Sequence, residues 1–223
     1  MKPERTALQS EAVNLLKELV ATPSFSKEEN DTAELIVAFF ERHHISYARV
    51  GNNVYAKNKW YDAAKPSVLL NSHHDTVRPN KGYTMDPFTA LEKEGKLFGL
   101  GSNDAGGCLV SLMAAFLYFC DNENLNHNVV FAASAEEEIS GVNGIELVLP
   151  YLGQIDFGIV GEPTQLEMAV AERGLMVIDC TAQGHAGHAA RNEGENALYK
   201  AFEDINWIRN YQFEKVSDLL GES

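Results

Sequence analysis

Apolar residues recur at helical spacing in two segments near the amino terminus. Residues 7–20 place leucine and alanine every three or four positions, and residues 26–40 repeat this pattern. The second segment opens with Ser26 and, three positions later, Glu29, which is the capping-box signature of a helix start. The pattern therefore predicts two amphipathic helices, the second beginning at Ser26.

Further along, short apolar runs bounded by turn residues predict strands, and a longer one predicts a buried helix over 105–119. The predicted strands cover residues 45–50, 53–57, 67–71, 129–133 and 157–160. Strand and helix then alternate, which is typical of an α/β fold. We expect a mixed, mostly parallel sheet flanked by helices.

The pattern changes near residues 172–174. Residues 175–180 are expected to form an extended strand, with Leu175, Val177 and Asp179 on one face and the residues between them on the other. A Gly- and His-rich turn then leads to an amphipathic helix over 195–211. About fifty residues is close to the lower limit for independent folding. We therefore divide the chain into a larger domain, 1–173, and one half of a second domain, 174–223.

Composition and charge narrow the class of protein. The chain has 223 residues, of which 45% are hydrophobic and 22% charged, as in an ordinary globular protein. Its net charge is −14, from 32 acidic against 18 basic residues. This charge repels phosphate backbones, so nucleic acid is not an expected partner.

The three cysteines are too few for a disulfide framework, which favours a reducing compartment. The amino terminus mixes acids with bases and has neither a long apolar run nor a cleavage site. The longest apolar stretch, around 109–119, is too short to span a bilayer. We expect a cytoplasmic protein without a membrane anchor.

Histidines and acidic residues stand where the predicted strands end or the buried helix begins. They are His73, His74, Asp75, Asp104, Glu136, Glu137, Glu138 and Glu162. The carboxyl ends of strands in an open α/β sheet line one ligand crevice, so distant segments can meet there. This placement predicts a metal site.

The first cluster holds two candidate imidazole ligands. Successive strand residues point to opposite faces, so His73 and Asp75 share a face that His74 does not. Asp75 can then hold the ring nitrogen that is not bound to metal. We favour His73, with His74 as the rival, although a strand-end histidine is often only a surface or core residue.

Three adjacent glutamates repel one another unless a cation offsets their charge, although a solvated loop is the simpler interpretation. One glutamate can bind a metal while its neighbour acts as a general base. Asp104 and Glu162 add hard oxygen ligands, but Asp104 taken alone is more typical of a helix cap.

Other chemistries fit less well. The glycines at 99, 101, 106 and 107 have neither the spacing of a dinucleotide fingerprint nor the lysine of a phosphate loop. No serine stands in a nucleophile elbow, and Cys108 lies in an apolar run where a buried thiol is expected.

Five motifs carry a resemblance that spans most of the chain. In order they are SHHDTV, GLGSNDAGG, SAEEEISG, VGEPT and GHAGHAARNEGENAL. Together they resemble the dinuclear-zinc aminoacylase and carboxypeptidase G family, and most closely its acetylornithine deacetylase and succinyl-diaminopimelate desuccinylase branch. The resemblance implies a zinc-exopeptidase-like catalytic domain followed by the first half of a small α+β ferredoxin-like dimerisation domain, and hence a homodimer.

The resemblance also implies a role for each clustered residue. Two zinc ions, or cobalt in their place, would be bound by His73, Asp104 and Glu162 at one position and by Asp104 and Glu138 at the other. Asp75 would orient His73, and Glu137 would be the general base. His188 would reach the active site of the partner subunit and steady the oxyanion, with His185 the less suitable candidate.

The implied activity is removal of an acetyl or succinyl group from an N-acylated amino acid such as ornithine, as in arginine biosynthesis. The alternatives are a dipeptidase, aminopeptidase or carboxypeptidase of the same family, or a non-catalytic dimerisation module. Members of the family are longer, and a later histidine completes their second zinc site. We therefore expect this chain to be a fragment of a longer enzyme, with a weak second site.

Overall fold

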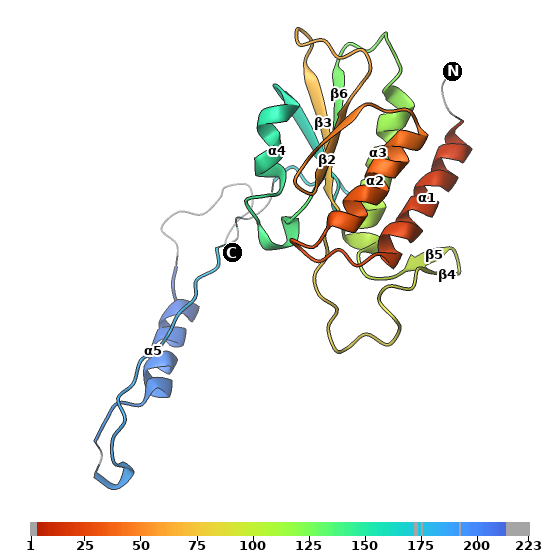
Figure 1. Cartoon of the computed structure of the whole chain (residues 1–223). Helices are drawn as coiled ribbons and strands as arrows, with labels where there is room; N and C mark the ends of the chain where they lie inside the picture. Colours follow the sequence, from red (N-terminus) through yellow and green to blue (C-terminus); the bar gives the residue numbers. More distant parts are fainter. Residues whose placement is uncertain (1–3, 172–173, 175, 192, 213–223) are drawn as a thin grey trace. The chain divides into compact units, whose positions relative to one another are not determined.

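The computed structural model describes residues 4–171, 174, 176–191 and 193–212 (Figure 1). The chain divides into two compact units, Met1–Leu166 and Glu167–Ser223. Among the described residues, no helix combines the length and apolar character that crossing a bilayer requires.

The first unit is built on a five-stranded sheet with the strand order β1-β2-β6-β3-β7. Its strands are β1 (Tyr47–Val50), β2 (Asn53–Lys57), β3 (Ser67–His73), β6 (Asn128–Ser134) and β7 (Phe157–Val160). Its helices are α1 (Arg5–Ala21), α2 (Asn30–Arg42), α3 (Gly107–Phe119) and α4 (Ile145–Leu152). A separate antiparallel hairpin joins β4 (Leu91–Lys93) to β5 (Lys96–Phe98).

Strand β3 lies at the centre of the parallel part of the sheet. It pairs in parallel with β6, where His73 lies opposite Ser134, and with β7, where Asn71 lies opposite Val160. The pairs β1–β2 and β2–β6 are antiparallel. The predicted mixed sheet is confirmed, and its parallel part brings the ends of three strands to one edge.

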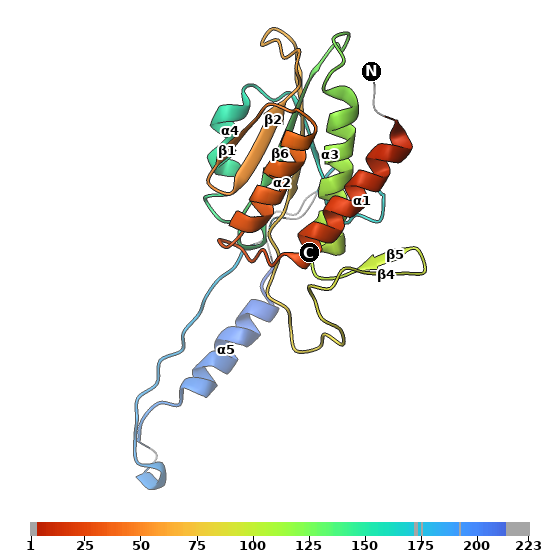
Figure 2. The same ribbon diagram turned by 45° about the vertical axis from the view of Figure 1, so that its right-hand side comes forward.

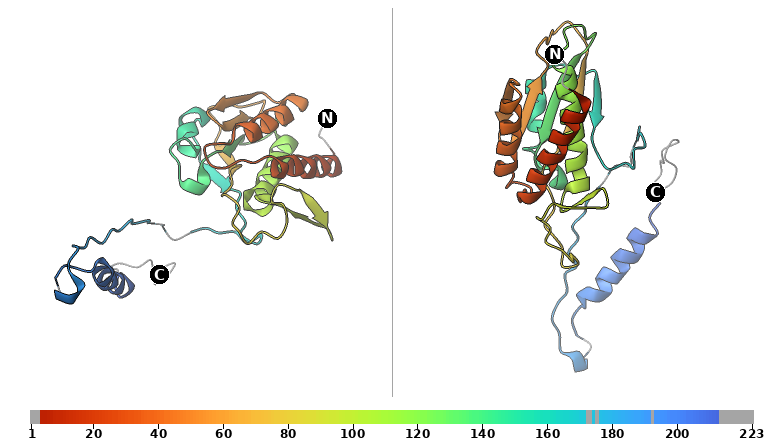
Figure 3. Two further views of the ribbon diagram at one scale, coloured as in Figure 1. Left: turned by 60° about the horizontal axis from the view of Figure 1, so that its bottom comes forward. Right: turned by 90° about the vertical axis from the view of Figure 1, so that its right-hand side faces the viewer.

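Helices cover both faces of the sheet (Figure 2, Figure 3). Leu70 and Phe131 point to the face that packs against α1, α2 and α3. Their neighbours Leu69 and Val130 point the other way and pack with Val148 of α4. The alternation of side chains along each buried strand thus produces two apolar cores, which fix the sheet between its helices.

The start of the second helix differs from the prediction. α2 begins at Asn30, and neither Ser26 nor Glu29 makes the side-chain hydrogen bonds of a capping box. The Ser26 hydroxyl donates to Asp75 at 2.7 Å instead. The predicted capping box was wrong because Ser26 binds Asp75 instead of the helix end, and the Glu29 carboxylate accepts from the backbone N–H groups of Lys27 and Glu136.

The second unit contains helix α5 (Ala197–Arg209), which lies within the predicted range 195–211. The side chain of Asn196 accepts a hydrogen bond from the backbone N–H of Leu198 and so caps this helix. Residues 176–180, within the predicted strand 175–180, form no strand, and residue 175 lies outside the described residues. An extended segment needs a pairing partner, and the backbone bridge in this region joins His185 to Glu195.

Candidate metal centre

His73 is the last residue of β3, and its imidazole is completely buried, with 0% of the side chain exposed. Its Nδ1 lies 2.9 Å from the backbone carbonyl oxygen of Asp75 and 3.3 Å from the carboxylate Oδ1 of the same residue. A carbonyl oxygen only accepts hydrogen bonds, so Nδ1 carries a proton and donates it. In the neutral ring, Nε2 is therefore the nitrogen with a free lone pair.

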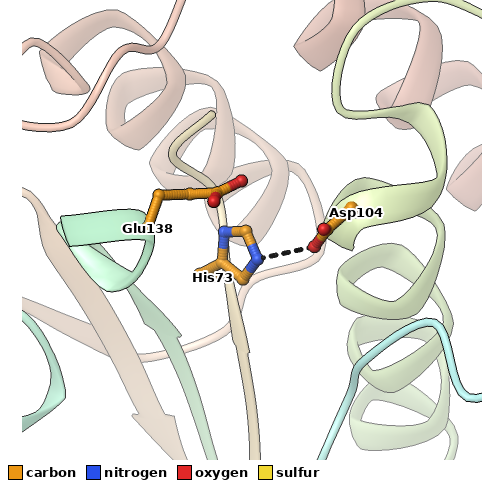
Figure 4. A group of neighbouring side chains, drawn as sticks. All are labelled: His73, Asp104 and Glu138. Carbon is orange, nitrogen blue, oxygen red and sulfur yellow. Dashed lines mark hydrogen bonds and ion pairs between the residues drawn. The ribbon is translucent and has the colours of Figure 1, made fainter. Parts of the chain in front are cut away.

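Three carboxylates surround Nε2 of His73. Its distances are 3.1 Å to Asp104 Oδ1, 3.7 Å to Glu137 Oε2 and 3.9 Å to Glu162 Oε2. Figure 4 shows Asp104 and Glu138 lying on either side of the imidazole, with the His73–Asp104 contact drawn as a dashed line. The nitrogen that is free to bind a metal therefore faces a group of oxygen ligands.

Asp104 lies in the turn Ser102–Gly106, directly before α3. The residue at the N-cap position of α3 is Gly106, and no side chain caps the helix there. Asp104 has 56% of its side chain exposed, and its carboxylate contacts His73 rather than the helix end. The simpler interpretation of Asp104 as a helix cap is therefore wrong.

The three consecutive glutamates follow β6 and occupy three different environments. Glu136 is buried and accepts a hydrogen bond from Asn143, whereas Glu137 has 52% of its side chain exposed. Glu138 is half-buried, and its pKa is raised first by burial and then by the negative charge of Asp104. Because Glu137 and Glu138 belong to the groups of ligand atoms around His73 while Glu136 is buried, the segment is not a uniform solvated loop.

Glu162 follows β7 and approaches from the opposite side of β3. Burial and the negative charges of Glu137, Asp104 and Glu138 raise its pKa to about 7, against the opposing effect of His73. Burial and the neighbouring negative charges together thus favour the protonated form of Glu162.

Burial lowers the pKa of His73, but the hydrogen bond and charge of Asp75, together with Glu162 and Glu137, outweigh it and raise the pKa to about 9. The cluster therefore holds a proton on an imidazole and raises the proton affinity of two carboxylates. Both effects mark a place of negative potential that a bound cation would offset. The residues fit a divalent metal ion.

Two overlapping groups of ligand atoms are close enough to hold a metal ion. One comprises His73, Asp104 and Glu138, and the other His73, Glu137 and Glu162, with the ligand atoms of each group within 4.8 Å of one another. The structure thus brings together His73, Asp104, Glu137, Glu138 and Glu162, although it groups them differently from the sequence scheme.

His74 faces away from this cluster. Its Nε2 donates to the backbone carbonyl of Asn52 at 3.0 Å, and its Nδ1 lies 2.9 Å from the hydroxyl of Thr32. Burial lowers its pKa to about 4, so the ring is neutral. Both ring nitrogens have partners in the core, which leaves His73 as the imidazole of the cluster.

His188 lies in the second unit, on the exposed turn before α5. Its Nδ1 accepts a hydrogen bond from the backbone N–H of Ala190 at 3.2 Å. The neutral ring therefore carries its proton on Nε2 and can donate from that nitrogen. The rival His185 instead lies 3.4 Å from the carboxylate of Glu195.

Ser26 and Glu29 contact residues next to this cluster, and their sequence pattern had assigned both to a helix cap. Ser26 donates to the carboxylate of Asp75, and Glu29 accepts from the backbone N–H of Glu136. Both lie in the loop between α1 and α2, where Thr76 N–H also donates to the carbonyl of Ser24. The serine–glutamate spacing gave no signal that distinguishes these contacts from a capping box.

The chain is similar in sequence to two known enzymes. The chain is 36% identical over 143 residues to an acetylornithine deacetylase of Proteus mirabilis, covering 63% of this chain and 37% of that protein. It is 28% identical over 227 residues to a succinyl-diaminopimelate desuccinylase of Coxiella burnetii, covering 94% of this chain and 60% of that protein. The chain therefore spans between about a third and three fifths of the length of these relatives.

Among solved structures, an M20 family metallo-carboxypeptidase from Sulfolobus solfataricus matches with a TM-score of 0.55 and 25% identity, over 68% of this chain and 37% of that one. Residues 69–217, which include His73, Asp104, the three glutamates 136–138, Glu162 and His188, match the family described as Peptidase family M20/M25/M40. On this match, the chain belongs to Peptidase family M20/M25/M40.

Proposed function

We propose that this chain carries the active site of a metal-dependent amidohydrolase that removes the acyl group from a small N-acylated amino acid. The observation that carries the proposal is the arrangement around His73 Nε2, where three carboxylate oxygens lie within 3.9 Å. The names of the two curated relatives, a deacetylase and a desuccinylase, support an acyl amino acid as the substrate.

The metal ligands in this proposal are His73, Asp104, Glu138 and Glu162. Imidazole and carboxylate oxygen suit zinc, and cobalt is the expected substitute. Asp104 is assigned to both ions, because it contacts His73 and also raises the pKa of Glu138 by its charge. The second position has fewer ligands among the described residues, so its ion is expected to bind more weakly.

Metal ions bound here would supply Lewis acidity toward the acyl carbonyl and lower the pKa of water. Glu137 takes a proton from the water whose oxygen attacks the acyl carbon. When the C–N bond breaks, Glu137 gives that proton to the departing amine nitrogen. Its half-exposed carboxylate leaves room for a substrate, and Asp75 holds its backbone N–H in place.

His188 is assigned to the developing oxyanion, toward which its Nε2–H can donate. In this proposal the segment 174–223 belongs to a dimerisation domain, and His188 acts in the site of the partner subunit of a cytoplasmic homodimer. The residues 1–173 form the catalytic part. The fixed Nδ1 contact with Ala190 supports the donor role, because it leaves the proton on Nε2.

A peptide is the second candidate substrate. The Sulfolobus solfataricus structure is named a metallo-carboxypeptidase, and hydrolysis of a peptide bond requires the same base and metal chemistry. In both cases an amine is released from a carbonyl carbon, so the substrates differ in the groups that flank the amide.

The test is amine release by the full-length protein, loaded with zinc or cobalt, from N-acetylornithine, N-succinyl-diaminopimelate and a panel of dipeptides. We expect release from an acylated amino acid that stops when the metal is chelated and returns when it is restored. Release from dipeptides alone would replace the deacylase proposal with the peptidase. Failure of the metal-loaded protein to hydrolyse any of these amides would overturn both.

A further inference from the structure

Glu29 is a buried carboxylate that lies outside the group of metal-ligand candidates. It directly precedes α2, and the residue is 0% exposed. Its Oε1 accepts from the backbone N–H of Lys27 at 2.6 Å and of Glu136 at 3.1 Å. Its Oε2 accepts from Nδ2 of Asn52 at 2.8 Å. A buried carboxylate is costly unless such donors satisfy it, so the three N–H groups form a binding site for this side chain.

The contact with Glu136 matters because that residue opens the turn bearing Glu137 and Glu138. Glu136 has a φ of +53° and Ser140 a φ of +49°, a left-handed conformation that residues other than glycine seldom adopt. The turn is closed by the N–H of Gly141, which donates to the carbonyl of Glu136 at 2.8 Å. A turn in this conformation persists where surrounding contacts hold it.

Two carboxylates supply those contacts. The N–H of Glu136 donates to Glu29, while the N–H groups of Glu137 and Glu138 donate to Asp75 at 3.0 and 3.1 Å. Three successive backbone N–H groups of the turn are thus fixed from outside. Asp75 also contacts His73, whereas the contact of Glu29 with the turn is to its first residue, Glu136.

We propose that Glu29 is a positioning residue that sets the direction of the Glu137 and Glu138 side chains by holding the N–H of Glu136. A side chain that acts through the residues around a metal typically changes activity or metal affinity when it is replaced. The expected effect on turnover rests on the proposed function, but the effect on the turn does not.

The first test is independent of metal and activity. Amide hydrogen exchange at Glu136 is measured by NMR in the metal-free protein and in the variants Glu29→Ala and Glu29→Gln. The matched control is Glu28→Gln, since Glu28 is exposed and pairs with Arg78. We expect exchange at Glu136 to be about 10-fold faster or more in Glu29→Ala and unchanged in the control. Unchanged protection in Glu29→Ala would overturn the proposal.

The second test separates positioning from simple loss of folding. In the metal-loaded Glu29→Ala protein we expect kcat to fall about 10- to 100-fold while KM changes by less than about threefold. Glu29→Gln keeps one acceptor oxygen and should fall between Glu29→Ala and the wild type. A loss of kcat that disappears once rates are scaled to the folded fraction would contradict a positioning role. If the wild type itself hydrolyses no amide, the proposed function fails and the exchange measurement still decides the role of Glu29.

Discussion

The carboxylate of Asp75 accepts a hydrogen bond from the backbone N–H of Glu137 at 3.0 Å. This contact joins the end of β3 to the turn after β6, across 62 positions of sequence. Asp75 also lies against His73, so one buried carboxylate orients both the candidate ligand and the candidate base. Its side chain is completely buried, and its pKa is lowered because hydrogen bonds from His73, Ser26 and Glu137 outweigh the cost of burial.

Asp75→Asn should therefore damage the site without removing a metal ligand. An amide places an NH2 group where one carboxylate oxygen accepts a hydrogen bond, and the facing N–H groups cannot accept in return. We expect the free energy of unfolding to fall by about 2–3 kcal/mol and kcat to fall about 100-fold. Urea unfolding and steady-state kinetics measure the two effects.

The control for Asp75→Asn is Asp86→Asn, because Asp86 is exposed and accepts from the nearby Phe88 and Thr89. Ser26→Ala removes one of the hydrogen bonds to Asp75 and should have a smaller effect in the same direction. Wild-type stability in Asp75→Asn would show that these contacts do not hold the turn.

Glu137→Gln tests the general base. The amide cannot take up a proton, so we expect kcat to fall by about 10²- to 10⁴-fold with the metal still bound. Glu138→Gln is the matched neighbour and should instead lower metal affinity, since Glu138 belongs to the group with His73 and Asp104. Metal content by atomic spectroscopy and amine release distinguish the two variants. Substantial turnover by Glu137→Gln would reject its role as base.

The sequence predicted the parallel core and the position of the candidate site for a physical reason. Strands buried on both faces are continuous apolar runs, and the acidic residues that follow them stand out against those runs. The alternation of side chains also separated His73 from His74 correctly, since His74 contacts Thr32 and Asn52 in the core. A continuous apolar run thus shows where a buried strand ends, and the two-residue alternation of side chains shows which face each residue occupies.

The roles of Ser26 and Glu29 could not be predicted in this way. Their spacing matches a local capping box, but their partners Asp75 and Glu136 lie 49 and 107 positions away. Residues 176–180 show the same limit, because a segment of strand-forming residues becomes a strand only where a neighbouring strand completes its hydrogen bonds. Interactions of long sequence separation decide both cases.

The buried His74 should make stability depend on pH. Its pKa is about 4 in the folded protein and about 6.5 when unfolded, so between these values the unfolded chain binds more protons. The stabilising contribution is fully present above about pH 6.5 and is lost as the pH falls toward 4. A difference of this size is worth on the order of 3 kcal/mol.

His73 and Glu162, whose pKa values are about 9 and about 7, also contribute to the dependence of stability on pH. The effect of His74 is therefore isolated by comparing the wild type with His74→Gln. Urea unfolding from pH 4 to 8 should show a steeper loss of stability in acid for the wild type than for the variant. Parallel curves for the two proteins would contradict the prediction that His74 is buried in its neutral form.

Removal of metal should expose the repulsion among the carboxylates, and Glu162→Gln tests this directly. Without a cation, burial and the negative charges of the neighbouring carboxylates raise the pKa of Glu162 to about 7. A raised carboxyl pKa contributes stability that is present below the unfolded value of 4.5 and is lost as the pH rises through 7. At pH 8 the metal-free Glu162→Gln protein should therefore be at least as stable as the metal-free wild type.

With zinc bound, the wild type should instead be more stable than Glu162→Gln. A ligand that binds only the folded state stabilises it by RT ln(1 + [L]/Kd), so zinc should raise the Tm of the wild type. Glu162→Gln loses a ligand and should show a smaller rise at the same zinc concentration. Thermal unfolding with and without zinc at pH 8 measures both signs in one experiment. If Glu162→Gln were destabilised without metal and gained as much from zinc as the wild type, Glu162 would be a structural residue and not a metal ligand.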